Sequence, residues 1–406
     1  MKILILNDDF PPFGWSSPGQ LACNTAKALV KRGHEVSVLT TTQDKTQAGV
    51  KEIDNLKYYV LYSDYHIRWR NYVSLSNRLL NSQVGKIIEE IKPEVVHCHN
   101  LHLHLSYQSI VVASKYCRRI FLTAHDYLLF SHAKITKEQI RRKYSANDFI
   151  KQAGKRYNPL RNLIIRKKIK RLKKIFALSS AQKEILLLNK INNVEVLYNS
   201  IDVSEWQAND YEVKNFKDKN KLNNKKVIFF AARMSPEKGL GKTLEAFDLI
   251  SQKKSDCVLL LAGNENNYTK KIINSLDDEL RQKIIFTGWL TRREIKTGYY
   301  AADVVLTPSL YPDPFNMINL EAMSSHKPIV GTCYGGTPEI VKDGVTGYIV
   351  DPFNAGEIAK KCVCLLKNEA LARRLGENGY RRAVEKFSLE KHLNKLLLYY
   401  EGDNKK

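Results

Sequence analysis

Short, continuous apolar runs separated by amphipathic stretches constrain the fold of this chain more than any other feature. In the first half the runs are KILIL, EVSVLT, EVVHCH and RIFLTAH. The second half repeats the alternation with KVIFFAA, CVLLLAG, KIIFTG, DVVLTPS and KPIVGT. Strands that are apolar throughout are buried on both faces, which is typical of parallel sheets covered by helices. The sequence therefore predicts an α/β protein with two doubly wound units.

The division between the two units is predicted where the composition turns polar and irregular, in DVSEWQANDYEVKNFKDKN. A chain of 406 residues favours two domains of about 200 residues each. We expect an N-terminal domain over 1–200 and a C-terminal domain over 201–387. A last helix within 388–406 is expected to cross back to the first domain. Ligands of such sheets bind at the carboxyl ends of the strands, so the residues that follow each apolar run are the candidates for a site.

The formal net charge of +23 has a local source. Residues 134–174 hold sixteen Lys and Arg but only Glu138 and Asp148 as acids, a surplus of fourteen. We call residues 134–175 the basic segment and interpret it as an insert. Its end, RNLIIRKKIKRLKKIF, gives an apolar stripe beneath a basic face if it is helical. That helix could lie on an anionic membrane surface or pack on a core with its basic face in solvent. Nucleic acid is not expected as a partner, because no recognised binding module accompanies the charge.

The cysteines and the hydropathy of the chain indicate the cellular compartment in which the protein is expected. Seven cysteines are scattered without a C-x-x-C pair, which suits reduced thiols. The first apolar run is too short for a signal-peptide core, and no run reaches the eighteen apolar residues of a membrane span. We expect a cytoplasmic protein that is at most peripheral on the inner face of the plasma membrane.

The segment ARMSPEKGLGKTLEAF contains GLGKT, the end of an apparent ATP-binding loop. The phosphate-loop pattern requires glycine five residues before Gly241, but Pro236 stands there and has no N–H to offer a phosphate. A nucleoside-triphosphatase is therefore excluded. What remains is a strand, a turn and a helix, with Arg233 and Lys238 at the junction. That arrangement suits an anion, because helix N-termini present unpaired N–H groups.

Two carboxylates stand eight residues apart in SLYPDPFNMINLEAMSSHKPIVGTCYGGTPE. Asp313 is expected before a helix that begins near Pro314, and Glu321 two turns into that helix. Carboxylates accept hydrogen bonds from sugar hydroxyls. The alternative is a helix-capping aspartate and an ordinary surface glutamate.

This segment resembles the signature of the retaining glycosyltransferases of family 4. The family has Glu, seven residues and Glu, followed by EAM, a Lys-Pro strand start and a G-G-x-x-E turn. This chain has EAM at 321–323, KPIV at 327–330 and GGTPE at 335–339. The resemblance implies the GT-B fold, in which two Rossmann-like domains face each other across a cleft that holds a nucleotide sugar. It also implies that Glu321 binds the nucleotide ribose, and that Asp313 replaces the family's first Glu with a shorter side chain. The donor-side residues implied between the acids are Phe315, Asn316 and Met317.

The family pattern R-x-x-x-x-K-G is matched by Arg233 and Lys238 with Gly239. The resemblance implies that the two cations grip the donor diphosphate. Two fixed cations can neutralise a diphosphate leaving group without a metal ion. We therefore expect no metal and no cofactor, with a UDP-sugar or GDP-sugar as the donor substrate.

The first domain resembles the family in NDDFPPFGWSSPGQ, where Gly19 matches the residue that lets the backbone approach the donor phosphate. Four histidines follow in HCHNLHLHL. They could hold zinc, but the carboxylate and Cys partners of such sites are missing, so a strand end and a loop that lines the cleft are favoured. The family's strand is similar here, and the resemblance implies that His99 faces the acceptor side. RIFLTAHDY places His125 and Asp126 at another strand end. The resemblance implies hydrogen bonding of His125 to the transferred sugar. A general base and a buried structural histidine are the alternatives.

Together these features predict a retaining transferase of the hexosyl or N-acetylhexosaminyl type. It would move a sugar from a UDP- or GDP-sugar to a hydroxyl of a lipid-linked saccharide or glycolipid in cell-surface polysaccharide synthesis. The alternatives are a soluble transferase that makes a small glycoside or storage glucan, and a non-catalytic protein that binds a sugar nucleotide or nucleic acid.

Overall fold

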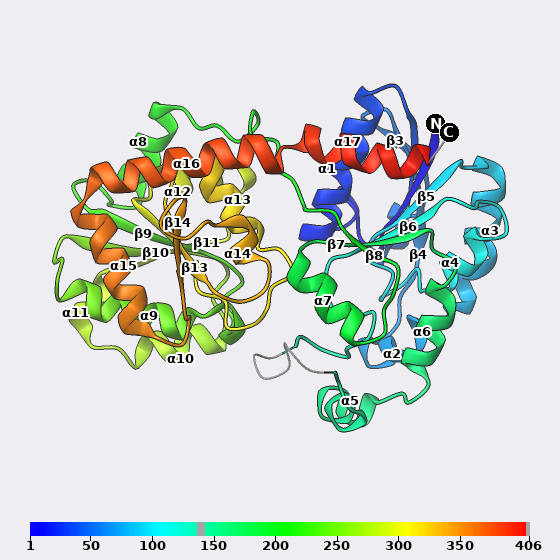
Figure 1. Ribbon diagram of the computed structural model, residues 1–406, viewed down its shortest axis with the longest axis horizontal. Coiled ribbons are helices and arrows are strands. Elements are labelled where there is room, and N and C mark those ends of the chain that lie inside the picture. Colours follow the sequence, from blue (N-terminus) through cyan, green and yellow to red (C-terminus); the bar gives the residue numbers. More distant parts are fainter. Residues whose placement is uncertain (136–142, 403–406) are drawn as a thin grey trace. The chain divides into compact units, whose positions relative to one another are not determined.

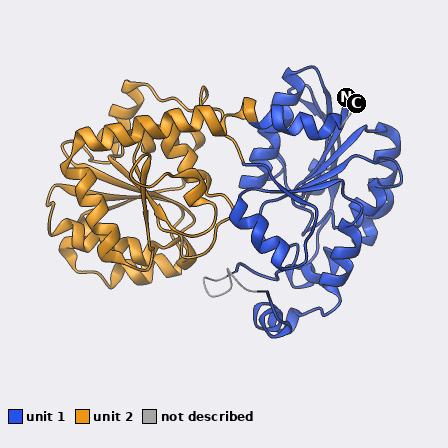
Figure 2. Cartoon of the chain, viewed as in Figure 1, with its two compact units in different colours: residues 1–198, 392–406 blue, residues 199–391 orange. Residues whose placement is uncertain are grey.

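The computed structural model describes residues 1–135 and 143–402 and divides the chain into two compact units. Unit 1 comprises Met1–Tyr198 and His392–Lys406, and unit 2 comprises Asn199–Lys391 (Figure 2). Each unit has a largely parallel sheet with helices on both faces (Figure 1). The expected α/β, doubly wound fold class is confirmed.

The described part of unit 1 forms an eight-stranded sheet in the order β3-β4-β2-β1-β5-β6-β7-β8. All neighbours are parallel except β3, which pairs antiparallel with β4 at the edge. The strands are β1 (Lys2–Leu6), β2 (Glu35–Thr42), β3 (Gly49–Ile53), β4 (Leu56–Tyr62), β5 (Val95–Cys98), β6 (Ile120–Ala124), β7 (Lys174–Ala177) and β8 (Val194–Val196).

The helices of unit 1 cover both faces of this sheet (Figure 1). Within it, Tyr400 contacts His97 of β5 and the ring of Phe121 in β6. None of the helices in the described ranges is both long and apolar enough to cross a bilayer. The helices are α1 (Ser17–Lys31), α2 (Arg70–Val73), α3 (Arg78–Ile91), α4 (Gln108–Ala113), α5 (Ala146–Ala153), α6 (Arg161–Ile169), α7 (Ser180–Leu188) and α17 (Leu389–Glu401), the last from His392 onward.

Unit 2 has a parallel six-stranded sheet in the order β11-β10-β9-β12-β13-β14. Its central strands are fully or almost fully buried apolar runs, as in β9 and β10, so the burial explains why the sequence shows no alternation. The strands are β9 (Lys226–Ala231), β10 (Cys257–Ala262), β11 (Ile284–Gly288), β12 (Val304–Thr307), β13 (Ile329–Thr332) and β14 (Gly347–Val350). The helices are α8 (Asp210–Lys219), α9 (Leu240–Ser251), α10 (Asn267–Asn274), α11 (Asp278–Gln282), α12 (Arg292–Ala301), α13 (Met317–Ser324), α14 (Thr337–Ile340), α15 (Ala355–Lys367) and α16 (Glu369–Phe387).

The end of the basic segment differs from the expected amphipathic helix. Helix α6 ends at Ile169, and the apolar residues Ile175 and Phe176 belong to β7, where they pair with β6 and are buried. A continuous helix over RNLIIRKKIKRLKKIF is therefore wrong, because burial in the sheet outweighs the helical spacing of the apolar residues. Residues 136–142 of the basic segment lie outside the described residues.

Candidate active site

The predicted cations of unit 2 lie at the point where the strand order of its sheet reverses. Strand β9 is followed in the chain by β10 on one side, whereas β12 lies on its other side, so the carboxyl ends of β9 and β12 form the switch point at which such sheets bind ligands. Arg233 follows β9 and is exposed. Lys238 ends the short 3₁₀ helix Pro236–Lys238, and only Gly239 separates it from α9.

Lys238 and Asp313 form a buried ion pair. The Lys238 Nζ lies 2.6 Å from the Asp313 Oδ2, and both side chains are little exposed. The hydroxyl of Tyr311 donates to the same oxygen at 2.7 Å, and the N–H of Phe315 donates to Oδ1 at 3.2 Å. Burial alone would raise the pKa of Asp313. The charge of Lys238 and the hydrogen bonds from Lys238 and Tyr311 outweigh burial and hold that pKa below its usual range. Asp313 is therefore a carboxylate at neutral pH.

Two glycines let backbone segments approach at this site. Gly239 has φ +86°, and a Cβ there would stand 2.0 Å from the carbonyl oxygen of Pro308. Gly335 has φ +66°, and a Cβ there would stand 2.2 Å from the carbonyl oxygen of Asp313. At these two glycines the backbone segments after β9, β12 and β13 approach each other closely. This close approach explains why glycine stands in the Lys-Gly and Gly-Gly motifs.

We predict that Gly239→Ala destabilises the protein more than Gly344→Ala does. Both positions have positive φ, but a Cβ added at Gly344 would meet no neighbouring atom within 4 Å. Gly344→Ala should therefore cost only the left-handed backbone strain of about 1–2 kcal/mol, whereas Gly239→Ala adds a backbone clash. Urea unfolding of both variants measures the difference. Equal midpoints for the two variants would contradict the close approach.

Glu321 is the fifth residue of α13 and is half-buried. The hydroxyl of Tyr299 donates to its Oε2 at 2.6 Å. Burial raises the pKa of Glu321, while Tyr299 and the charge of Arg292 oppose the increase. Burial and the neighbouring Glu321 raise the pKa of Tyr299, so this phenol keeps the proton that it donates.

The non-helical segment after Asp313 is longer than expected, so the helix that carries Glu321 begins later. Helix α13 begins at Met317 with Asn316 as its N-cap, and not near Pro314. The reason is that the Asp313 carboxylate accepts the N–H of Phe315 and keeps this stretch outside the helix. The Phe315 ring is buried and contacts Phe387, while Met317 is partly exposed.

In unit 1 the predicted histidines meet at the carboxyl ends of β5 and β6. The His99 Nδ1 lies 2.9 Å from the His125 Nε2, and the two rings stack. His97 also stacks on His99 and bonds to Tyr400 and Thr123. Burial lowers the pKa of His125 to about 4 and that of His99 well below its usual value. Both imidazoles are therefore neutral at pH 7, and they can donate or accept hydrogen bonds without carrying charge.

Asp126 and Gly19 have local partners. The Asp126 Oδ1 accepts the N–H of Leu128 at 2.8 Å, and its Oδ2 lies 3.7 Å from the His102 Nδ1. Gly19 lies in the first turn of α1, where a Cβ would stand 2.5 Å from the carbonyl oxygen of Asp9. Its lack of a side chain thus lets α1 approach the loop after β1.

Asp8 was missed by the sequence analysis. It is buried and accepts the N–H groups of three consecutive residues of the histidine loop, at 2.7–2.8 Å. Burial raises its pKa to about 7 although these three donors oppose the increase. Its place just after the first strand was the available signal. Asp8 fixes the loop that follows His99, since that loop spans Leu103, His104 and Leu105.

In residues 1–135 and 143–402, no group of three or more His, Cys, Asp or Glu side chains could hold a metal ion. The four clustered histidines instead divide between different partners. His104 bonds to Ser63, for example, whereas His99 bonds to His125.

Comparison with known proteins agrees with this geometry. The profile of Glycosyltransferase Family 4 matches residues 19–205, and that of Glycosyl transferases group 1 matches residues 212–382. An uncharacterized glycosyltransferase of Methanocaldococcus jannaschii is 24% identical over 395 residues, covering 96% of this chain and 95% of that protein. Two further relatives from Bacillus subtilis are matched over 54% and 50% of their own length.

Solved structures share the fold over the whole chain. Sucrose-phosphate synthase from Thermosynechococcus elongatus superposes with a TM-score of 0.76 at 17% identity, covering 98% of both chains. The Anabaena protein HepE in complex with UDP-glucose superposes with a TM-score of 0.69 at 17% identity, again over 98% of both chains. The two α/β units thus have the GT-B fold. The chain belongs to glycosyltransferase family 4, whose group 1 members transfer a sugar from a nucleotide sugar.

Proposed function

We propose that this enzyme transfers a hexosyl or N-acetylhexosaminyl group from a UDP- or GDP-sugar to a hydroxyl, with retention of anomeric configuration and without a metal ion. The observation that carries the proposal is the pair of cations at the switch point of unit 2. Lys238 is fixed there by Asp313, while Arg233 is exposed beside the strand end. Fixed positive charges stabilise the negative charge that develops on a leaving diphosphate.

In the proposed reaction the bond between the anomeric carbon and the diphosphate oxygen breaks. The acceptor oxygen forms its bond to the same carbon from the face that the diphosphate leaves. The proton of the acceptor hydroxyl passes to the departing phosphate oxygen. Arg233 and Lys238 would stabilise that oxygen. Asp313 holds Lys238 in place and would contact the sugar.

Unit 2, with residues 201–387, is the proposed nucleotide-sugar domain. The carboxylate of Glu321, held by Tyr299, would accept hydrogen bonds from the ribose hydroxyls. The segment with Phe315, Asn316 and Met317 would line the donor through its backbone and side chains.

Residues 1–200 are the proposed acceptor domain; unit 1 contains them as far as Tyr198, together with the helix within 388–406 from His392 onward. The neutral His125 would hydrogen-bond the transferred sugar. Its contact with His99 would hold the His125 imidazole ring in place. Asp126 would lie on the acceptor side, and Gly19 would let the backbone near α1 approach the donor phosphate.

A nucleotide-sugar panel tests the proposal. A ligand that binds only the native state raises the melting temperature, so UDP- or GDP-sugars should stabilise the protein. Release of the nucleoside diphosphate should follow and should persist in EDTA. Proton NMR of the product should show the donor's anomeric configuration. Binding without any release would instead indicate a sugar-nucleotide-binding protein, and an inverted product would contradict retention.

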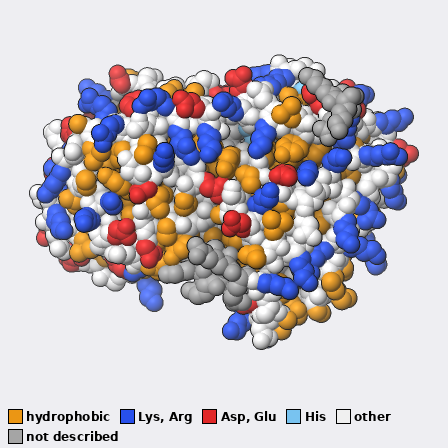
Figure 3. Space-filling view, in the orientation of Figure 1, with side chains coloured by type: hydrophobic (Ala, Val, Ile, Leu, Met, Phe, Trp, Pro, Cys, Tyr) orange, Lys and Arg blue, Asp and Glu red, His pale blue; other side chains and the backbone are white. Residues whose placement is uncertain are grey.

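We further propose that the acceptor is a lipid-linked saccharide or glycolipid reached at an anionic membrane surface. Large apolar side chains are exposed among the cations of unit 1, including Trp69 and Tyr72, and Leu160 and Leu163 of the basic segment. On the face drawn in Figure 3, Lys, Arg and hydrophobic side chains lie together at the lower edge, where α5 is seen in Figure 1. Aromatic and basic residues together favour the membrane interface.

Vesicle flotation tests this surface. The protein should float with vesicles that contain anionic lipid and not with neutral ones, and Leu160→Asp/Leu163→Asp should reduce flotation. The matched control is Leu398→Asp, which also changes an exposed leucine but lies outside the basic segment. Equal flotation of all variants, or none at low salt, would contradict the proposed surface.

A further inference from the structure

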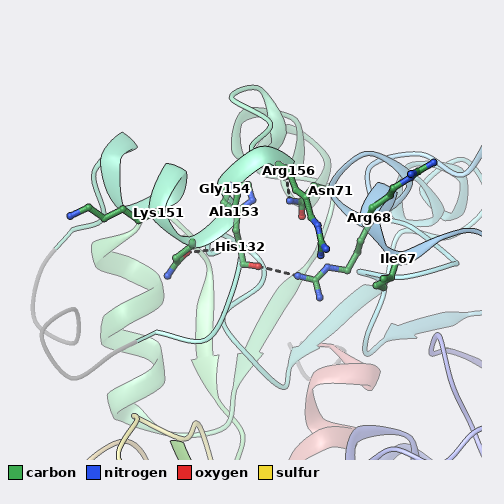
Figure 4. A pocket seen from close by; sticks show the side chains of 10 residues that line it. Ile67, Arg68, Asn71, His132, Lys151, Ala153, Gly154 and Arg156 are labelled. Atoms are coloured by element: carbon green, nitrogen blue, oxygen red, sulfur yellow. Dashed lines mark hydrogen bonds between the residues drawn. The ribbon is translucent and has the colours of Figure 1, made fainter. Parts of the chain in front are cut away.

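A basic pocket of about 440 Å³ opens in unit 1. It is formed by residues before and within α2, by His132, and by the end of α5 and the turn after it, where residues 151–154 and Arg156 line it. Four of its lining side chains are cations: Arg68, Arg70, Lys151 and Arg156. In Figure 4 Lys151 lies at one side of the pocket and Arg68 at the other, with Asn71 and Arg156 between them. The pocket is therefore lined by cations from two separate chain segments.

Among the described residues these cations lack acidic counterparts. No Asp or Glu lines the pocket, and none of the four forms an ion pair with a carboxylate in the described ranges. Like charges gathered around one opening repel each other and raise the local concentration of anions. An anion in the pocket would relieve that repulsion.

The pocket is fixed by hydrogen bonds between its own walls. The Arg70 guanidinium donates to the carbonyl oxygen of His132 at 3.0 Å, a bond drawn in Figure 4. The Asn71 side chain donates to the carbonyl oxygen of Arg156 at 2.8 Å, and the N–H of His132 donates to the side chain of Gln152 at 3.0 Å. Since the two cationic segments are tied to each other and to His132, the charges are preorganised for a ligand.

Two buried polar atoms of the lining have no hydrogen-bond partner in the described part of the chain. They are the His132 Nδ1, in a residue that is only 4% exposed, and the Gln152 Nε2. Burial lowers the pKa of His132 to about 4, and the charges of Arg161 and Arg70 add to this. Buried polar atoms without partners are rare and call for a reason such as a missing ligand. A ligand oxygen in the pocket would supply the hydrogen-bond acceptor that the Gln152 amide lacks.

The pocket is linked to the carboxyl end of β6. His132 stands six residues after Asp126, and the connecting segment is held by Arg161, which donates to the carbonyl oxygen of Leu128 at 2.5 Å. Burial lowers the pKa of His102, and the charge of Arg70 adds to this effect. The same His102 lies 3.7 Å from Asp126. A group bound in the pocket would therefore lie on the same side of unit 1 as the proposed acceptor residues.

We propose that this pocket binds a phosphate or diphosphate group carried by the acceptor. The inference rests on the proposed function of unit 1 as the acceptor domain. Arginine is well suited to the role, because its planar guanidinium binds phosphate oxygens in pairs. The phosphoryl group holds the acceptor, and its hydroxyl-bearing part extends toward the end of β6.

Titration of inorganic pyrophosphate into the full-length protein tests the pocket. Saturating UDP or GDP first occupies the donor site, so that Arg233 and Lys238 do not bind the probe. Arg68→Gln/Arg156→Gln should weaken pyrophosphate binding by about 10–100-fold, the effect of losing charge-assisted hydrogen bonds. The matched control is Lys155→Gln/Lys190→Gln, which removes two exposed cations that do not line the pocket. Equal affinity of the two double variants would overturn the proposal.

The source of the phosphate is distinguished by competition with the bound pyrophosphate. Displacement by a soluble sugar phosphate supports a soluble acceptor, and displacement only by vesicles with phosphatidic acid supports a lipid-linked one. Displacement by neither overturns the acceptor assignment. In transfer assays the pocket variant should raise the KM for a phosphorylated acceptor and leave donor hydrolysis unchanged. Failure of the nucleotide to bind in the first step would count against the proposed function alone, because the difference in pyrophosphate affinity between the pocket variant and its control still isolates binding in the pocket.

Discussion

Lys238→Ala is expected to lower kcat for sugar transfer by about 10²–10³-fold, the usual effect of removing one preorganised donor to a developing oxyanion. The side chain is held within 2.6 Å of Asp313, so it needs little reorganisation when the diphosphate leaves. Because the interaction strengthens as charge develops, the loss should appear in kcat more than in the KM for the donor. Release of the nucleoside diphosphate at saturating donor measures it.

The same substitution is expected to cost about 3 kcal/mol of stability at pH 7, because it leaves the buried Asp313 without its cation. The pKa of Asp313 is lowered in the folded state, so its contribution to stability is present above the unfolded pKa and is lost as the pH falls through the folded pKa. The stability difference between the wild type and Lys238→Ala should therefore shrink in acid. Urea unfolding at several pH values measures this trend.

Two further variants separate activity from stability. Lys238→Ala/Asp313→Asn removes the uncompensated charge and should recover stability without recovering kcat. Lys242→Ala, at a partly exposed position of α9 with Glu245 as its partner, should leave kcat within a factor of about two. A kcat of Lys238→Ala equal to that of the Lys242 control would refute the role of this cation.

The architecture was predictable because it depends on local sequence. KILIL and CVLLLAG are buried on both faces of parallel sheets, and such strands read as unbroken apolar runs. The positions of candidate site residues at strand ends were predictable for the same reason, since Arg233 and His125 closely follow strands. The edge strand β3, with the sequence GVKEI, is half polar and gave no comparable signal.

Contacts between distant residues were not predictable from spacing. The Lys238–Asp313 and Tyr299–Glu321 pairs join positions that are 75 and 22 residues apart. The interpretation of the basic segment failed at Ile175 and Phe176 because their helical spacing on the apolar stripe is also compatible with a buried strand. Only pairing of β7 with β6 and β8 decides between the two.

Glu321→Gln is expected to raise the KM for the nucleotide sugar by about 10–100-fold, because hydrogen bonds to a charged acceptor are worth about 1.5–3 kcal/mol. The kcat should change much less, since the nucleotide ribose takes no part in bond breaking and is bound equally in the ground and transition states. Glutamine retains an oxygen that can accept the Tyr299 hydroxyl at its present distance of 2.6 Å, so the fold should persist. Steady-state kinetics with varied donor concentration measure both constants.

Tyr299→Phe provides the test of positioning. It removes the hydrogen bond but leaves the Glu321 carboxylate in place, so the KM should rise less than in Glu321→Gln. Glu245→Gln, which changes an exposed glutamate on α9, should leave the KM unchanged. Glu321→Ala would leave the buried Tyr299 hydroxyl without its acceptor and should cost about 1–3 kcal/mol in urea unfolding. If Glu321→Gln lowers kcat but not donor affinity, Glu321 acts at the reacting centre, and the assignment of this carboxylate to the ribose is wrong.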